Sequence, residues 1–188
     1  MHTTEEIEDI IDNGHKDLFI EELSQYREAG RDINRIDEVG YTWLTRALVS
    51  HHVHPYEGCT EERVRAVLAA GADPNVSDAT CCPLLYACGW QYGYGLGPTA
   101  SLVKILLNAG ANRAPCINID IPSTFIDENG NIDCRDDIIK NINSLEAWLA
   151  DIEYNVEIVE RCYPDMHSSS IKTLRELAEI RRLLSTTM

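Results

Sequence analysis

Apolar residues recur along this chain at helical spacing, in runs that end at glycine. Residues 169–185 show the pattern most simply, because their apolar side chains stand three to four positions apart, as on one face of an amphipathic helix. Residues 4–12 and 15–29 predict two further helices, with a break at Asp12-Asn13-Gly14 between them. The apolar face of the C-terminal helix consists of Ile171, Leu174, Leu177, Ile180, Leu183 and Leu184.

The ends of these helical runs repeat. The segment VRAVLAAGADPNVSD (64–78) is echoed by VKILLNAGANRAP (103–115), and an earlier copy reads YREAGRDINRID (26–37). In each copy a glycine can take the left-handed conformation that closes a helix, and Asp or Asn residues suited to a turn follow it. The three glycines are Gly30, Gly71 and Gly110.

The starts of the units repeat as well. IDEVGYTWLTRAL (36–48) is echoed by SDATCCPLLYACG (77–89), and a third start, IDENGNIDCRDDII (126–139), repeats the Ile-Asp-Glu-x-Gly of the first. Self-similarity at a period of about 40 residues is typical of stacked units that bury their apolar faces against one another. The sequence therefore predicts three repeats, at about 37–71, 78–112 and 127–162.

These repeats resemble the ankyrin repeat family, whose pattern runs D-x-x-G-x-T-P-L-H-x-A-A and then V-x-x-L-L-x-x-G-A-D-x-N. The first unit matches at Asp37, Gly40, Thr42, Leu44, Ala47, Val64, Val67, Leu68, Gly71, Ala72, Asp73 and Asn75. The next unit matches at Pro83, Leu84, Ala87, Val103, Leu106, Leu107, Gly110, Ala111 and Asn112. The resemblance covers residues 1–160 and is strongest at 30–112.

The chain departs from the family pattern at the start of each repeat. Thr45 and Leu85 replace the family's histidine, Trp43 replaces its proline, and Cys82 stands where threonine is usual. We therefore expect part of the local hydrogen bonding of that tetrapeptide to be lost. The fold is expected to persist, because the apolar and glycine positions are kept.

The resemblance implies an all-α fold, an ankyrin-like solenoid of helix pairs with short hairpin fingers. Residues 1–30 are expected to form an N-terminal capping helix pair, 31–162 the repeats, and 163–188 a C-terminal capping helix. A terminal repeat must hide its apolar face, so this last helix is expected to cover the open end of the stack.

Both central repeats are longer than the usual 33 residues of the family, and the extra residues fall between their two helices. The first insertion is SHHVHPYEGC (50–59), and the second, GWQYGYGLGP (89–98), stands at the equivalent place. Equivalent loops of stacked units lie side by side. The two insertions therefore predict one composite surface, formed by His51, His52, His54, Tyr56, Trp90, Tyr92 and Tyr94.

This composite surface has three interpretations. Tyr and Trp dominate binding hot spots, which favours a partner-binding surface. The aromatic side chains could instead pack onto the stack as core material. His51, His52, His54 and Cys59 could also hold zinc or nickel, although no second ligand pair follows at a familiar spacing. We expect no bound metal and no cofactor.

The sequence shows only weak signals for other metal-binding or catalytic sites. Residues 125–136 look like a calcium loop, but Phe125 and Asp136 stand where that loop needs an aspartate and a glutamate. Cys81, Cys82 and Cys88 are expected to act as small buried hydrophobes. The sequence contains no phosphate loop, dinucleotide fingerprint or zincin motif.

Charge narrows the class of partner. The formal net charge is −15, which disfavours nucleic acid and anionic membranes and favours a basic protein partner. Eleven acidic residues stand at positions 120–160, and they predict an acidic face or simply a solvated one. Seven cysteines without a C-x-x-C pair, together with an acidic N-terminus, favour reduced thiols in the cytoplasm.

The resemblance implies a non-catalytic role in protein binding through the concave face. The first hypothesis is a stoichiometric inhibitor of one partner, for example an immunity protein that neutralises a bacterial toxin. The second is an adaptor that recruits a client to a larger assembly, and the third is a metal-dependent enzyme using the histidine loop. Beyond the insertions, the expected finger-tip contacts are Glu38, Val39, Tyr41, Ala79, Thr80, Glu128 and Asn129.

Overall fold

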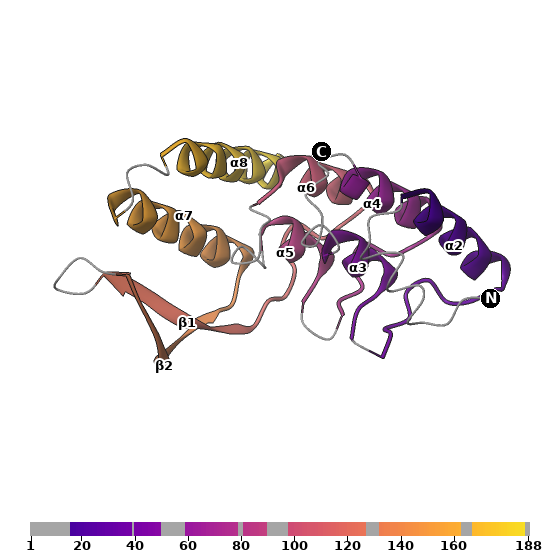
Figure 1. Cartoon of the computed structure of the whole chain (residues 1–188), viewed down its shortest axis with the longest axis horizontal. Helices are drawn as coiled ribbons and strands as arrows, with labels where there is room; N and C mark the ends of the chain where they lie inside the picture. The colour runs from indigo at the N-terminus through magenta and orange to yellow at the C-terminus, as the bar shows by residue number, and fades with distance from the viewer. Residues whose placement is uncertain are drawn as a thin grey trace. The chain divides into compact units, whose positions relative to one another are not determined.

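The computed structural model describes residues 16–38, 40–49, 59–78, 81–89, 98–126, 132–162 and 167–186. The chain is mostly helical and divides into two compact units, Met1–Asn112 and Arg113–Met188. The described part contains seven helices and one pair of strands, which can be followed in Figure 1. Among those residues, no helix is both long and apolar enough to cross a membrane.

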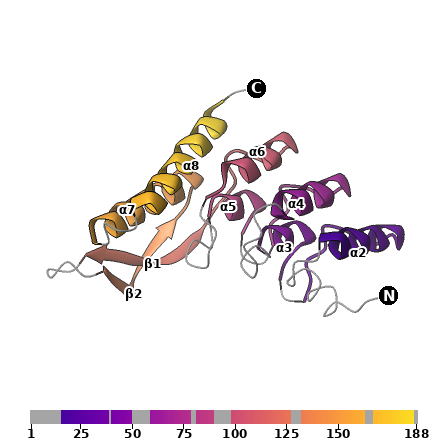
Figure 2. The same ribbon diagram turned by 45° about the horizontal axis from the view of Figure 1, so that its top comes forward.

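The first unit consists of helices packed in two layers. Its elements are α2 (Lys16–Glu28), α3 (Trp43–Val49), α4 (Cys59–Ala69), α5 (Pro83–Ala87) and α6 (Ala100–Asn108). Helix α3 packs on α4 and α5 packs on α6, and the two pairs meet through α3 with α5 and through α4 with α6. Figure 2 shows α2, α4 and α6 in one layer and the shorter α3 and α5 in the other.

The core of this unit is built from the positions that repeat in the sequence. Phe19 and Tyr26 of α2 place their rings against Trp43, with ring centroids 5.7 and 5.2 Å from that of the indole. The remaining core side chains come from α3 to α6 and are almost fully buried: Leu44, Ala47, Val64, Val67, Leu84, Leu85, Ala87, Leu102, Val103 and Leu106. The predicted apolar periodicity of the helices is thus confirmed at these positions.

Helices α2, α4 and α6 each end at a glycine with positive φ, as the sequence predicts. The φ angles are 68° at Gly30, 99° at Gly71 and 94° at Gly110. The backbone N–H after each of these glycines returns to the helix, from Arg31 to the carbonyl of Tyr26, from Ala72 to that of Val67 and from Ala111 to that of Leu106. A side chain is strained in this conformation, so glycine is needed there.

The turns that follow these glycines are joined to one another. Asn34 Oδ1 accepts a hydrogen bond from the backbone N–H of Asp73 at 2.9 Å, and Asn75 Oδ1 accepts one from the N–H of Asn112 at 2.7 Å. Asn75 Nδ2 also donates to the carbonyl of Gly110 at 3.1 Å. Side chains at equivalent positions therefore hold successive helix pairs of this unit in register.

The second unit combines a hairpin with a helix pair. Strands β1 (Ile119–Ile126) and β2 (Ile132–Ile142) are antiparallel, and their register shifts between Pro122 and Ser123. Proline lacks an N–H to donate to the ladder, which suits it to such an irregular position. Helices α7 (Leu145–Cys162) and α8 (His167–Ser185) pack on each other, and α7 also packs on both strands (Figure 2).

Apolar and charged contacts both hold the second unit together. The guanidinium of Arg181 on α8 pairs with Glu146 at 3.0 Å and with Glu153, both on α7. Arg113 donates to the carbonyls of Leu183 and Leu184 in the last turn of α8. The apolar core contains Ile117, Ile142, Leu145, Trp148, Leu149, Ile152, Val156, Leu177 and Ile180.

The structure differs from the prediction between residues 127 and 162. A repeat of two helices is expected there, but residues 132–142 form strand β2, and one 18-residue helix, α7, follows. The segment 119–126 (IDIPSTFI) explains the difference, because its β-branched residues and proline disfavour a helix and supply β2 with a strand to pair with. Helix α8 agrees with the amphipathic helix predicted at 169–185.

Candidate functional site

The structure describes two of the predicted partner-binding residues, Glu38 and Tyr41. Glu38 is exposed, and Tyr41 is half-buried at the start of α3. The other predicted contacts lie outside the described residues: Val39, His51, His52, His54, Tyr56, Ala79, Thr80, Trp90, Tyr92, Tyr94, Glu128 and Asn129. The composite surface therefore stays a prediction, and the histidine metal site stays an untested alternative.

The structure does describe the points at which the second insertion leaves and rejoins the helix pair. Gly89 has a φ of 86°, and a Cβ atom placed on it would lie 3.1 Å from the backbone nitrogen of Pro98. The backbone N–H of Thr99 donates to the carbonyl of Ala87 at 2.9 Å. The chain therefore returns at Pro98 to the place where it left at Gly89.

The first insertion occupies the equivalent place. It connects Val49, the last residue of α3, to Cys59, the first residue of α4. Because α3 packs on α5 and α4 packs on α6, the two insertions connect the helices of two neighbouring, packed pairs. This placement of their ends is what the predicted composite surface requires.

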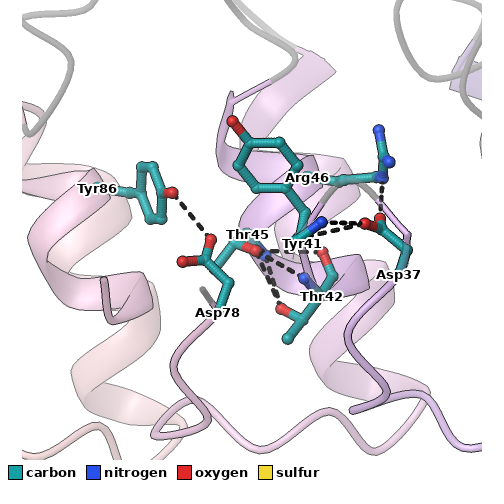
Figure 3. A network of polar contacts seen from close by, with 8 residues as sticks. Asp37, Tyr41, Thr42, Thr45, Arg46, Asp78 and Tyr86 are labelled. Atoms are coloured by element: carbon teal, nitrogen blue, oxygen red, sulfur yellow. Dashed lines mark hydrogen bonds and ion pairs between the residues drawn. The ribbon is translucent and has the colours of Figure 1, made fainter. Parts of the chain in front are cut away.

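The finger before α3 holds Tyr41 through a network of polar contacts (Figure 3). The carboxylate of Asp37 accepts hydrogen bonds from the backbone N–H groups of Gly40 and Tyr41 at 2.8 and 2.9 Å. Its other oxygen pairs with Nε of Arg46, whose guanidinium carbon lies 5.5 Å from the centre of the Tyr41 ring. Tyr41 is thus fixed by a carboxylate on its backbone and a cation on its ring.

The next finger repeats the arrangement with a different partner. Asp78 accepts a hydrogen bond from the backbone N–H of Cys81 at 2.8 Å. It accepts another from the hydroxyl of Tyr86, also at 2.8 Å (Figure 3). Burial, reinforced by the nearby Cys81 and Asp78, raises the pKa of Tyr86, which keeps the phenol protonated as a donor. Tyr86 therefore does for Asp78 what Arg46 does for Asp37.

Sequence reasoning missed this pair of carboxylates as anchors. Asp37 matches the family pattern, and Asp78 stands 41 residues later at the same place in the next unit. The repeated aspartate before each helix was the available signal. Arg46 and Tyr86, which bind these carboxylates, carried no such signal, because the two repeats use side chains of different chemistry at this place.

The side-chain hydrogen bonding at the start of the inner helix is kept in the first repeat and lost in the second. Thr42 and Thr45 bond reciprocally, the backbone N–H of each donating to the hydroxyl of the other at 2.9 and 3.1 Å. The expected loss is therefore wrong for the first repeat, because Thr45 takes over a capping role. Cys82 caps α5 without a side-chain hydrogen bond, which agrees with the expectation for the second repeat.

The cysteines of the second helix pair are core residues, as predicted. Cys81 and Cys82 are nearly buried, and Cys88 is fully buried. Burial is the main cause that raises the pKa of all three thiols, so they stay protonated and poorly nucleophilic near neutral pH. Within the described part of the chain, no three His, Cys, Asp or Glu side chains gather in a way that could hold a metal ion.

No protein-family model matches this chain, and no curated protein matches it at a significant level. The ankyrin resemblance therefore stays a prediction that rests on the residues of the repeats.

Proposed function

We propose that this chain is a non-catalytic protein-binding module, an ankyrin-repeat solenoid that binds and occludes one protein partner. An immunity protein that neutralises a bacterial toxin is the concrete case. The observation that supports the proposal most is the packing of the helices that the two insertions connect. Helices α3 and α4 pack on α5 and α6, and Gly89 lies against Pro98 where the second insertion leaves and rejoins its helix pair.

Preorganised loops on a rigid support favour binding, because less conformational entropy is lost when the partner docks. Hydrogen bonds to the side-chain amides of Asn34 and Asn75 fix the turns. The polar networks around Asp37 and Asp78 fix the fingers. The insertions between the helices carry Trp90, Tyr92 and Tyr94, residue types that dominate binding hot spots. The tyrosine and histidine residues of the first insertion would extend that surface.

Charge and thiol chemistry are in keeping with this role. A net charge of −15 steers a basic partner toward the protein and speeds association. Cys81, Cys82 and Cys88 are free thiols that burial keeps protonated, which supports a binding role over thiol catalysis. Free thiols also suit a reducing compartment, and we propose the cytoplasm.

The decisive experiment compares two triple variants in capture of a partner from the native lysate, followed by calorimetry on the purified pair. The test variant is Trp90→Ala/Tyr92→Ala/Tyr94→Ala. The control, Glu28→Ala/Arg65→Ala/Lys104→Ala, changes three exposed residues on α2, α4 and α6. We expect a one-to-one complex with a basic protein that the test variant loses and the control keeps.

Circular dichroism checks that both variants stay folded. Equal affinity of the test variant and the wild type would refute the proposed site. A partner that keeps its own activity inside the complex would refute the inhibitor role and favour an adaptor.

A further inference from the structure

The outward face of α7 combines an exposed aromatic ring with an unpaired carboxylate. Tyr154 is 47% exposed, and among the described residues Ile36 is the other large apolar or aromatic side chain with such exposure. Glu157, three residues on, lies on the same helix face and is also exposed. Within the described part of the chain, Glu157 forms no ion pair or hydrogen bond through its side chain.

The molecule already builds the complete form of this arrangement elsewhere. In the first finger, the guanidinium of Arg46 pairs with Asp37 and lies 5.5 Å from the ring centre of Tyr41. A guanidinium is planar, so it can stack on a ring while its N–H groups bond to a carboxylate. On α7 the ring and the carboxylate are present at neighbouring positions, but no cation of the described chain occupies them.

The same helix also receives a guanidinium one turn earlier. Arg181 of α8 lies between Glu146 and Glu153, so the carboxylates of α7 already pair with a guanidinium that reaches them from another helix. Five of the 18 residues of α7 are acidic, and Arg161 is its one basic residue. The helix as a whole therefore carries net negative charge, which favours a cation.

We propose that Tyr154 and Glu157 form a docking site for an arginine side chain of a basic partner protein. The guanidinium stacks on the Tyr154 ring and bonds to the Glu157 carboxylate. This site lies in the second unit, so it is independent of the proposed insertion surface in the first.

Arginine is preferred to lysine here for a physical reason. Its guanidinium is less strongly hydrated than an ammonium, and it satisfies a ring and a carboxylate at once. Arg161 stands one turn beyond Glu157 and is exposed, so its positive charge competes with an incoming arginine. Removing that charge should strengthen binding.

The test is a fluorescence-anisotropy titration at physiological ionic strength. The probe is a labelled peptide with four arginines at helical spacing in an alanine–glutamine background, and its twin carries lysines at the same positions. Tyr154→Ala should weaken binding of the arginine probe about fivefold, and Tyr154→Phe should stay within about twofold of the wild type. Glu157→Gln should also weaken binding, and Arg161→Gln should strengthen it.

Two controls separate the site from general attraction to an acidic protein. Ile36→Ala removes the other exposed apolar side chain, and Glu28→Gln removes an exposed carboxylate of α2, and neither should change binding by more than about twofold. NMR shift changes should centre on residues 150–161. The proposal is overturned by unchanged binding of Tyr154→Ala, by equal affinity for the lysine twin, by equal losses in the controls, or by no saturable binding.

Discussion

Asn75 Oδ1 accepts a hydrogen bond from the backbone N–H of Asn112 at 2.7 Å, across 37 residues of sequence. The Asn34 side chain makes the equivalent bond to the N–H of Asp73. Each amide thus satisfies a backbone donor in the next turn that would otherwise face solvent. The helix pairs of the first unit are linked through these turns as well as through their apolar cores.

Replacement of Asn75 tests this link. Asn75→Ala removes the bond from the Asn112 N–H and the bond to the Gly110 carbonyl, so unfolding free energy should fall by about 1–2 kcal/mol. Asn75→Asp keeps the acceptor and should lose less. Urea denaturation measures the unfolding free energy of both variants. A fall of less than about 0.3 kcal/mol for Asn75→Ala would show that the turns are not coupled through this side chain.

A hydroxyl at position 82 should stabilise the second helix pair. The backbone N–H groups of Leu85 and Leu84 act on the Cys82 sulfur and partly offset the rise in its pKa that burial causes, yet no capping hydrogen bond forms. Cys82→Thr should raise the unfolding free energy by about 0.5–1 kcal/mol, because an N-cap hydroxyl accepts hydrogen bonds from such N–H groups. Valine has a similar shape without the hydroxyl, so urea denaturation of Cys82→Val should show no such gain.

Alkaline pH should weaken the fold through the buried thiols. Burial raises the pKa of Cys88 above its ordinary value of 9.0, so the thiol stays protonated in the folded chain while the unfolded chain loses the proton. The protonated thiol stabilises the folded state fully below pH 9, and this stabilisation is lost as pH rises above that value. Each such thiol should make the unfolding free energy fall by about 1.4 kcal/mol per pH unit above pH 9.

Cys88→Ala provides the comparison for that slope. Urea denaturation between pH 8 and 10.5 should show a shallower fall of unfolding free energy in this variant than in the wild type, although the variant is less stable at pH 7 because it lacks a buried sulfur. Parallel curves for the two proteins would mean that Cys88 ionises alike in the folded and unfolded states.

Arg113 should hold the end of α8. Its guanidinium donates to the carbonyls of Leu183 and Leu184, where a cation also interacts favourably with the helix dipole. Arg113→Ala should speed hydrogen exchange of the backbone amides in the last turn of α8. Arg175→Ala, an exposed change in the middle of the same helix, is the control. Equal exchange in both variants would assign no role to the Arg113 contact.

Much of the first unit could be predicted from the sequence, because its signals are local and repeated. The glycines at 30, 71 and 110 marked the helix ends, and the apolar positions of α3 to α6 marked the core. The insertion points between the helices followed from the excess length of each repeat. These features depend on backbone conformation and periodicity, which a sequence displays directly.

The second unit and the polar networks were harder to predict. The Ile-Asp-Glu-x-Gly at 126–130 repeats an earlier motif, so it suggested a helix pair, although the β-strand pairing of 119–126 with 132–142 decides the local structure. Pairing between strands is a long-range property that propensity indicates weakly. Likewise, Arg46 and Tyr86 fulfil one role with different chemistry, so no shared residue type marks it.

The most direct test of partner binding through the insertions is site-specific photo-crosslinking in the native cell. A benzophenone amino acid replaces Tyr92 in one protein and the exposed Lys104 of α6 in another. The proposed function predicts one dominant crosslinked partner from position 92, in a one-to-one product, and none from position 104. Equal crosslinking from both positions, or crosslinking from position 104 alone, would contradict it.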